Sequence, residues 1–193
     1  MRGKSFDIND VLAKAAMTFW SKGYEATSLP VLEKSMGIKR QSLYDTFGSK
    51  HNLFLSSLKY YHQHVIARNF SPLFTAPSPK NAIKKYFYQR VKDVDDPAVI
   101  DGCLITNSLT ELGLSDKEVK RQTKKTLDYM ENAFYAAVKR AQELGEIDSS
   151  KDAKLIAIQL LNNAQGLFVM SKSGMSSNKL KALTDHFLKI LDE

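Results

Sequence analysis

The sequence predicts an all-α protein of about nine helices, and three observations lead to this prediction. The 193 residues include only nine glycines and five prolines, so there are few helix breakers. Residues that favour helices, namely Ala, Leu, Lys and Gln, are abundant. Apolar residues recur every three or four positions, whereas the alternation typical of strands is nearly absent. A chain of this length can bury a good core in one large domain or two small ones.

The charge is distributed unevenly along the chain. There are 28 lysines and arginines against 21 aspartates and glutamates, a net charge of +7. Residues 1–60 hold nine of these cations and five of the acids, a net +4, which leaves +3 for the other 133 residues. The N-terminal third is therefore more basic by density, which suits a polyanion such as DNA. Charge alone fits a basic protein with a solvated surface equally well.

Cysteine content and hydropathy indicate the compartment. The single cysteine, Cys103, excludes an intramolecular disulfide framework. The first ten residues contain no apolar segment of the signal-peptide type. The longest apolar stretch, residues 155–170, is interrupted by four side-chain amides and is shorter than the roughly 20 residues that span a bilayer. We therefore expect a cytoplasmic protein without a membrane partner.

The first predicted helix runs from residue 8 to the glycine at position 23. Apolar residues from Ile8 to Trp20 follow the i, i+3, i+4, i+7 spacing of a single helical face. Asp7 can cap the start, and Gly23 can end the helix in the left-handed conformation. This segment is expected to pack its apolar face on the helices that follow.

The second and third predicted helices form a helix-turn-helix motif. Thr27 is the expected N-cap of the second helix, which ends near Gly37. A turn of about four residues around this glycine leads to a third helix, roughly residues 40–47. In a helix-turn-helix motif the second of the two helices lies in the major groove of DNA.

Polar side chains gather at the start and on the outer side of the third helix, because Leu43 and Phe47 are four residues apart and can face inward. Arginine can donate bidentately to guanine and glutamine to adenine, while Ser and Tyr hydroxyls reach phosphates or base edges. Lys50, at the start of the next helix, joins a cation to unpaired backbone amides. The predicted DNA contacts are Thr27, Lys39, Arg40, Gln41, Ser42, Tyr44 and Lys50. The alternative is a surface helical hairpin whose cations are merely solvated.

More helices are predicted in the C-terminal two thirds. Ser49 caps a fourth helix that runs to about residue 68, and residues 71–79, with three prolines, form the expected domain boundary. The later helices are expected at about residues 80–92, 102–112, 116–144 with a capping box of Ser115 and Glu118, 150–172, and after residue 176. The helix at 150–172 is apolar nearly all round, so it needs cover on more than one side. A partner subunit is the expected cover, and complete burial within the chain's own core is the alternative.

Residues 23–54 resemble the DNA-binding segment of the tetracycline-repressor (TetR) family. In that family a Gly-aromatic pair leads to Thr-Ser/Thr, then a Gly-Val/Ile turn, a Leu-Tyr pair, a Phe, and a Lys that opens the fourth helix. The matching residues are Gly23, Tyr24, Thr27, Ser28, Gly37, Ile38, Leu43, Tyr44, Phe47 and Lys50. The resemblance implies a homodimeric, mostly repressing transcription factor whose C-terminal helices bind a small-molecule effector.

We therefore expect two domains: residues 1–48 for DNA binding, and residues 49–193 for ligand binding and dimerisation, with the fourth helix as connector. The resemblance implies that the last two helices form a four-helix bundle with those of a second copy. Two recognition helices about 34–36 Å apart would read a near-palindromic double-stranded operator.

The resemblance extends to an effector site. Residues 101–113 resemble a Gly-Cys-Leu segment, and residues 166–174 a Gly-Leu…Lys-x-Gly segment, of one branch of the family in which some members sense electrophiles or oxidants through the cysteine. Cys103 is accordingly either a buried core residue or a thiolate sensor that Lys172 assists. A further set of aromatic and soft side chains either lines an apolar ligand site or forms plain core: Tyr86, Phe87, Tyr88, Met130, Phe134 and Phe168.

Enzyme functions have no support in the sequence. It contains no nucleophile elbow, phosphate-binding loop, dinucleotide-binding glycine motif or Cys/His metal pattern. We expect neither a cofactor nor a metal site. The alternative from a different functional class is a helical adaptor protein that binds other proteins and has no specific affinity for DNA.

Overall fold

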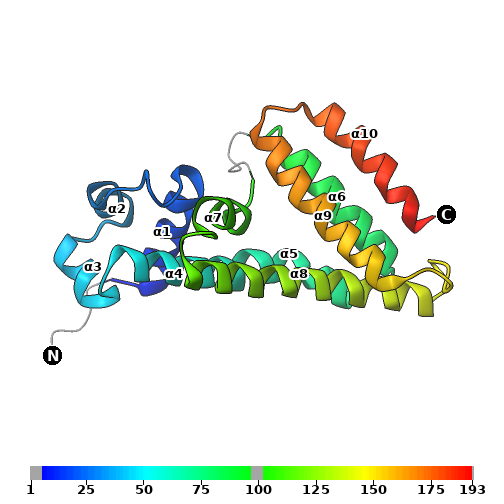
Figure 1. Ribbon diagram of the computed structural model, residues 1–193, viewed down its shortest axis with the longest axis horizontal. Helices are drawn as coiled ribbons and strands as arrows, with labels where there is room; N and C mark the ends of the chain where they lie inside the picture. The colour runs from blue at the N-terminus through cyan, green and yellow to red at the C-terminus, as the bar shows by residue number, and fades with distance from the viewer. Residues whose placement is uncertain (1–5, 97–101, 193) are drawn as a thin grey trace. The chain divides into compact units, whose positions relative to one another are not determined.

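The computed structural model describes residues 6–96 and 102–192, and its elements are all helical (Figure 1). Ten α-helices follow one another along these residues, with a short 3-10 helix, η2, near the end. Helices α4 and α5 are joined without a break by the π-helical segment η1, so this continuous run counts as one of nine helical segments. No strand occurs in the described ranges, and the predicted all-α class is confirmed.

The chain forms two compact units, the described parts of Met1–Val65 with Cys103–Lys124, and of Ile66–Gly102 with Lys125–Glu193. The first unit holds α1 (Ile8–Lys22), α2 (Leu29–Met36), α3 (Arg40–Phe47), α4 (Lys50–Tyr61), α7 (Leu104–Leu112) and the start of α8 (Lys117–Glu143). The second holds α5 (Ala67–Thr75), α6 (Pro79–Asp93), the rest of α8, α9 (Ala153–Lys172), α10 (Ser177–Phe187) and η2 (Leu188–Leu191). The chain passes between the units within η1 (His62–Ile66), within α8, and after residue 102. These two units are defined by which residues pack together. They do not test a division by function, so the expected domain boundary at residue 48 stays a prediction.

Helix α1 organises the core of the first unit. Asp7 caps it as predicted, because its carboxylate accepts a hydrogen bond from the Asn9 N–H at 2.8 Å. The buried face of α1 packs on α2 and α4, where the rings of Phe19 and Phe54 make an edge-to-face contact at a centroid distance of 5.0 Å. Both rings are fully buried, and burial of one such side chain contributes about 1.5–3 kcal/mol.

Aspartate carboxylates cap α8 and α9, whereas the sequence predicted that serines just before these aspartates begin the two helices. Asp116 accepts hydrogen bonds from two N–H groups in the first turn of α8 (2.9 and 3.0 Å), so the predicted capping box of Ser115 and Glu118 is wrong. Asp152 does the same for α9 (2.8 and 3.1 Å), which therefore does not start at Ser150. A carboxylate suits these positions because its charge faces the positive end of the helix dipole.

The fourth helical run continues to Thr75, about two turns past its predicted end. The expected boundary at residues 71–79 is therefore wrong, since residues 71–75 belong to this run and the whole segment lies inside the second unit. Phe70 and Leu73 are buried and extend the apolar face of the run. This burial outweighs Pro72, which lies inside α5 and removes one intrahelical hydrogen bond.

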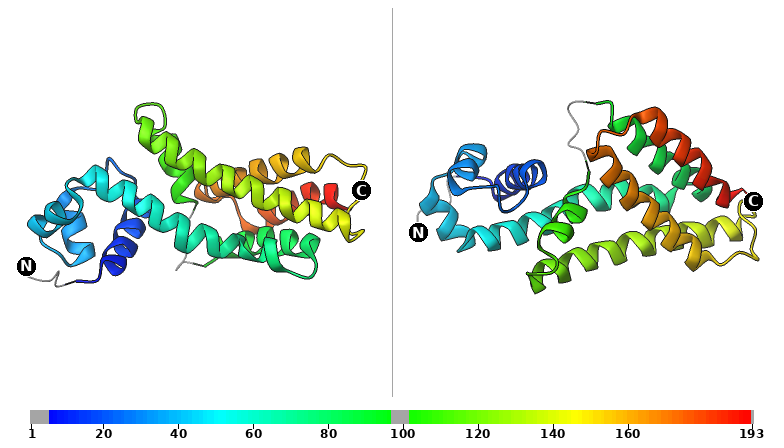
Figure 2. Two further views of the ribbon diagram at one scale, coloured as in Figure 1. Left: turned by 90° about the horizontal axis from the view of Figure 1, so that it is seen from below. Right: turned by 45° about the horizontal axis from the view of Figure 1, so that its top comes forward.

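The second unit has an aromatic core. Helix α6 packs against α5, α9 and α10, and Figure 2 shows these helices from two further directions. The rings of Phe87 and Phe134 lie nearly parallel with centroids 5.7 Å apart, and Phe70 meets Tyr86 at 4.8 Å. Phe187 of α10 adds an edge-to-face contact with Phe87 at 4.9 Å. Such offset and edge-on pairs add about 0.5–1.5 kcal/mol beyond the burial of their area.

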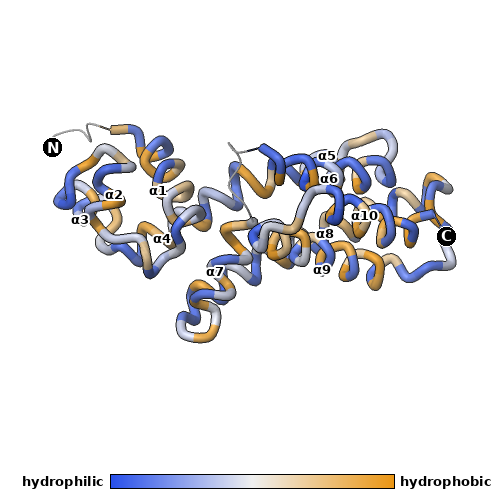
Figure 3. The backbone as a smooth tube through the Cα atoms, turned by 90° about the horizontal axis from the view of Figure 1, so that it is seen from above, coloured by the Kyte–Doolittle hydropathy of each residue, from blue (hydrophilic) through white to orange (hydrophobic). Residues whose placement is uncertain are grey.

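Helix α9 keeps an apolar face that its own chain does not cover. Leu160 is fully buried, but Leu155, Ile158 and Val169 are 62%, 43% and 51% exposed. Figure 3 shows apolar residues recurring along this helix. The alternative of complete burial within the chain's own core is therefore wrong. None of the described helices combines the length and the apolar character that crossing a membrane requires.

Candidate nucleic-acid interface

The turn between α2 and α3 has the geometry of a helix-turn-helix motif. Gly37 adopts the left-handed conformation (φ 70°, ψ 22°), and its N–H donates to the carbonyl oxygen of Glu33 at 3.0 Å. Glycine reaches this conformation without a steric penalty, so it can end α2 sharply. Ile38 and Leu43 are buried and fix the inner side of the turn and of α3. The opposite side of α3 is left facing solvent.

The predicted DNA contacts of α3 lie together on this outer side. Lys39, Arg40, Gln41 and Tyr44 are exposed, and Ser42 is half-buried. Lys39 is the residue before the helix and the others occupy its first five positions. The structure thus presents cations, an amide and two hydroxyls at the N-terminal end of one short helix.

Two carboxylates, which sequence reasoning missed, hold donors of this surface. Glu33 of α2 accepts the backbone N–H of Arg40 at 2.7 Å and lies 3.5 Å from its guanidinium group. Asp45 accepts a hydrogen bond from Nε2 of Gln41 at 2.7 Å. Glu33 satisfies one of the N–H groups that the first turn of a helix leaves unpaired. The four-residue spacing of Gln41 and Asp45 is a signal that would have predicted the second contact.

The start of α4 holds a second cation. Ser49 caps this helix as predicted, accepting the N–H of Asn52 at 3.0 Å. The Lys50 ammonium lies over the ring of Tyr24, 4.2 Å from its centre, in a cation–π contact. Burial, followed by the charge of Glu25, raises the pKa of the Tyr24 phenol. The ring therefore stays neutral at physiological pH and can hold the lysine beside the N-terminus of α4.

Thr27 differs from the other predicted contacts because it faces inward. Its side chain is fully buried, and its hydroxyl donates to the carbonyl oxygen of Gly23 at 2.5 Å. The N-cap of α2 is Ser28, which is exposed and makes no side-chain capping hydrogen bond. The prediction that Thr27 caps α2 is wrong, since this residue stabilises the preceding turn, and the hydroxyl open to solvent is that of Ser28.

Helix α7 contacts the turn between α1 and α2 through Glu111, which sequence reasoning also missed. Its carboxylate accepts the backbone N–H groups of Tyr24 and Glu25, both at 2.9 Å, in the turn between α1 and α2. Gly23 leaves room for this contact: its φ is +80°, and a Cβ there would lie 3.0 Å from a carboxylate oxygen of Glu111. The partners are 86 and 87 residues apart, so no local pattern could predict them.

A second contact joins the start of α4 to the start of α8. Nε2 of His51 lies 2.6 Å from a carboxylate oxygen of Asp116, the cap of α8. The N–H of Val119 lowers the pKa of Asp116 most, and His51 lowers it further. The segment from α7 to α8 therefore contacts the first four helices of the first unit's N-terminal part at two points, the α1–α2 turn and the start of α4.

The predicted effector residues do not converge on one site. Phe87, Met130 and Phe134 are fully buried in the aromatic core. Tyr88 donates its hydroxyl to Asp185 of α10 at 2.8 Å, and Phe168 is half-buried on α9. Their assignment to a ligand site stays a prediction, while their packing is that of core residues.

Cys103 and Lys172 belong to different units. Cys103 precedes α7 in the first unit, is 1% exposed, and lies 3.8 Å from the Tyr61 hydroxyl that donates to its sulfur. Lys172 ends α9 in the second unit, where a Cβ added to Gly102 would lie 2.8 Å from its Cδ. The burial of the thiol supports a core role. Within residues 6–96 and 102–192, no group of three or more His, Cys, Asp or Glu side chains is arranged to hold a metal ion.

Comparison with known proteins gives matches over both parts of the chain. The family model of bacterial regulatory proteins, tetR family, matches residues 11–56, and that of the tetracyclin repressor-like C-terminal domain matches residues 79–190. The HTH-type transcriptional regulator YezE of Bacillus subtilis (strain 168) is 35% identical over 192 residues, 99% of each chain. The HTH-type transcriptional repressor ComR of Escherichia coli (strain K12) is 29% identical over 193 residues, 100% of this chain and 92% of that protein.

Among solved structures, a cysteine-substituted form of the TetR family transcriptional regulator CifR, complexed with 26-base-pair double-strand operator DNA, is similar with a TM-score of 0.86. It is 26% identical, and the match covers 97% of this chain and 98% of that one.

Proposed function

The chain belongs to the TetR family of bacterial regulatory proteins, transcriptional regulators rather than enzymes, and from this premise we propose that it binds its operator through α3. The observation that carries the proposal is the exposed polar side of α3, which starts at Lys39 on the solvent side of a glycine turn. The first turn of α3 enters the major groove, where Arg40 donates to guanine and Gln41 to adenine. Ser42 and Tyr44 reach phosphates or base edges.

To contact bases, the side chains of Arg40 and Gln41 must leave their carboxylate partners, Glu33 and Asp45. Glu33 lies 3.5 Å from the Arg40 guanidinium, and exposed pairs of this kind are worth about 0–1 kcal/mol. A bidentate contact with a base is worth about 1–3 kcal/mol, so the exchange favours DNA. Two further groups hold phosphates on either side: Lys50 with the amides of α4, and Ser28 with the amides of α2.

Two copies pair through the apolar face that α9 and α10 expose. Leu155, Ile158 and Val169 of α9 and Leu183 of α10 are large apolar side chains with 43–62% exposure. Several large apolar side chains exposed on neighbouring helices favour an interaction surface. A pair of chains presents two α3 helices to successive major-groove turns, which calls for a near-palindromic operator.

Regulation follows from competition between conformations of the pair. An effector that binds more tightly to a form with mis-spaced α3 helices releases the DNA, since a ligand shifts an equilibrium only by its differential affinity. Repression is the proposed sense, in line with the relative ComR, and the cytoplasm is the proposed place of action. Within the family we place the chain in the branch with a Gly-Cys-Leu motif, here Gly102, Cys103 and Leu104. Burial favours a core role for its cysteine.

The test is fluorescence anisotropy with labelled DNA from upstream of the protein's own gene and with a scrambled duplex, at two salt concentrations. We expect tight binding that weakens with salt and prefers the upstream DNA. Arg40→Ala should cost about 1–3 kcal/mol on the operator and relax specificity, whereas Lys50→Ala should weaken binding to both duplexes alike. Lys59→Ala, an exposed cation further along α4, is the matched control and should bind as wild type does.

Two outcomes would contradict the assignment. If Arg40→Ala, like Lys50→Ala, lost the same binding free energy on the upstream DNA as on the scrambled DNA, Arg40 would not read bases. Binding that is weak, or unaffected by salt, on upstream and scrambled DNA alike would favour the adaptor protein, which tolerates both substitutions.

A further inference from the structure

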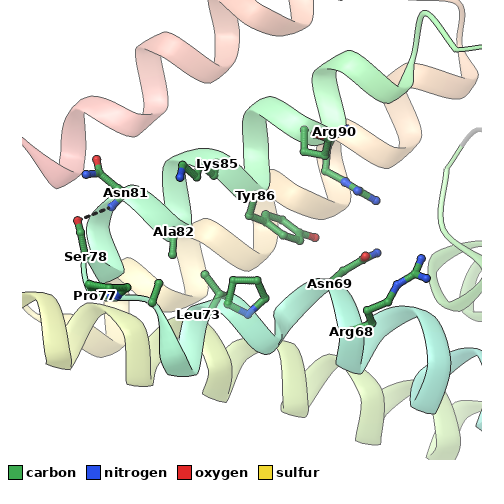
Figure 4. A pocket seen from close by; sticks show the side chains of 13 residues that line it. Arg68, Asn69, Leu73, Pro77, Ser78, Asn81, Ala82, Lys85, Tyr86 and Arg90 are labelled. Carbon is green, nitrogen blue, oxygen red and sulfur yellow. Dashed lines mark hydrogen bonds between the residues drawn. The ribbon is translucent and has the colours of Figure 1, made fainter.

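A groove of about 550 Å³ runs between α5 and α6 in the second unit (Figure 4). Its size lies within the usual range for small-molecule sites, about 300–1,000 Å³. Three cations line it together with apolar and neutral polar side chains, and no acidic side chain does among the residues that the structure describes. The lining residues that matter below are Arg68, Lys85, Arg90, Leu73, Ala82 and Tyr86. We call this feature the α5–α6 groove.

The groove holds two arginines at one end, and further along it holds apolar side chains together with Lys85. Figure 4 shows Arg68 and Arg90 near one another at one end, with the Tyr86 ring beside them. Leu73 and Ala82 lie further along, on the facing sides of α5 and α6. Such a polarity matches a molecule with one charged group and one apolar body.

The charge at the end with the two arginines is only partly neutralised. Arg68 is exposed there, while Lys85 lies further along the groove near Ala82 and is also exposed. Neither is paired with a carboxylate among the residues that the structure describes. Arg90 lies over the Tyr86 ring at 5.9 Å and gives one guanidinium nitrogen to Asp93 at 2.8 Å. Its Nε is buried and has no hydrogen-bond partner in the described ranges. An anion at this end would accept hydrogen bonds from the exposed Arg68 guanidinium and offset the repulsion between the like charges of the two arginines.

Contacts within the chain fix both walls. The Arg140 guanidinium donates to three carbonyl oxygens at the end of α5, at 2.8–3.2 Å. The Ser78 hydroxyl caps α6 by accepting the N–H of Asn81 at 3.2 Å. The buried Phe70 packs against the ring of Tyr86, which lines the groove. A site held in this way binds with little ordering cost.

We propose that the α5–α6 groove binds a small organic anion, with its acidic head group between Arg68 and Arg90 and its apolar body along Tyr86, Leu73 and Ala82. Arginine suits a carboxylate and a phosphate monoester equally, since both accept its forked N–H groups. The proposal deepens the proposed function by naming the class of the effector. Only its regulatory consequence rests on that function, because the binding itself can be measured without DNA.

The binding test is isothermal titration calorimetry of the full chain with octanoate and octyl phosphate, and with octanol as the neutral analogue. At least one anion should bind about tenfold or more tightly than octanol, because the head group makes charge-assisted hydrogen bonds. The tighter of the two anions identifies the head group. Arg68→Gln should weaken binding about tenfold, and Arg68→Lys should recover part of the loss. Lys92→Gln, an exposed cation on α6 outside the groove, is the matched control.

Three results would overturn the site: no binding of either anion, equal binding of octanol, or equal losses in Arg68→Gln and Lys92→Gln. Circular dichroism of each variant confirms that a loss does not come from unfolding.

The regulatory consequence is tested by adding the bound anion to the protein–operator complex. Operator affinity should fall for wild type and not for Arg68→Gln. Unchanged operator affinity for wild type with the anion bound would overturn the effector role and leave the site standing. Failure to bind any operator without ligand contradicts the proposed function instead, and it leaves the calorimetric result untouched.

Discussion

Replacing Glu111 by alanine tests how α7 supports the turn between α1 and α2. The change removes two hydrogen bonds of 2.9 Å to the N–H groups of Tyr24 and Glu25. Bonds to a charged acceptor contribute about 1.5–3 kcal/mol each when water is excluded. Glu111 is exposed, so water can replace part of each bond, and the neutral range of about 0.5–1.5 kcal/mol applies. Two such bonds give a loss of about 1–3 kcal/mol in the free energy of unfolding.

The assay is thermal unfolding combined with hydrogen exchange. Each kcal/mol lowers the Tm of a chain of this size by about 2–4 °C, so the loss is readily measured. Amide exchange should accelerate in residues 23–26 and stay unchanged in the turn between α2 and α3. Glu111→Gln keeps one neutral acceptor and should lose roughly half as much. Asp10→Asn, which breaks an exposed i,i+4 pair with Lys14 in the same unit, should change stability by less than about 0.5 kcal/mol.

The reasoning would be refuted if Glu111→Ala and Asp10→Asn gave the same Tm and the same exchange rates over residues 23–26. Water would then satisfy the two backbone N–H groups as well as the carboxylate does, and α7 would contribute nothing to the turn.

Three more predictions concern single side chains. Asp116→Ala should cost about 0.5–2 kcal/mol at neutral pH. The pKa of Asp116 in the folded state lies below its ordinary value of 3.8. The stabilisation is therefore lost as pH falls from about 3.8 through that lower pKa. In thermal unfolding, the Tm values of wild type and variant should converge in acid. Glu33→Gln should tighten binding to both duplexes in anisotropy titrations, because it removes a negative charge near the phosphates. The gain should be larger on the operator, because the change also frees Arg40; weaker binding would mean that Glu33 positions α3. Cys103 should react with N-ethylmaleimide only as fast as the native structure opens, so labelling should accelerate with sub-denaturing urea, and immediate labelling in buffer would contradict its burial.

Local features of three of the first four helices could be read from the sequence. Asp7, which precedes apolar residues at helical spacing, correctly predicted the start of α1, and Ser49 correctly predicted the start of α4. Helix α3 occupies the predicted residues. Each of these rests on residues within one or two turns of each other. The outer side of α3 was predictable for the same reason, because Leu43 fixes which side faces inward.

Contacts between distant residues could not be predicted in this way. Nothing near Glu111 or Asp116 indicates the turn or the histidine that they contact, 65 to 87 residues away. The π-helical turn between α4 and α5 likewise leaves no pattern beyond two buried residues, Tyr61 and Ile66, five positions apart. Thr27 was misassigned because a buried threonine in a turn and a capping threonine look the same in a sequence.

The residues of a ligand site could not be predicted from the sequence for a further reason. Aromatic residues at helical spacing occur both in cores and around apolar pockets, and Phe87 and Phe134 pack as core. The α5–α6 groove instead depends on Arg68 and Arg90, which belong to two helices, and on Pro72 lying inside α5 rather than in a loop.

The uncovered face of α9 has a consequence for gene dosage. If only paired chains bind the operator, then at concentrations below the dissociation constant of the pair, the amount of active regulator rises with the square of the chain concentration. Halving expression would then lower operator occupancy about fourfold while the operator is far from saturated. Leu155, Ile158 and Val169 would thereby set how sharply the controlled genes respond to the supply of their regulator.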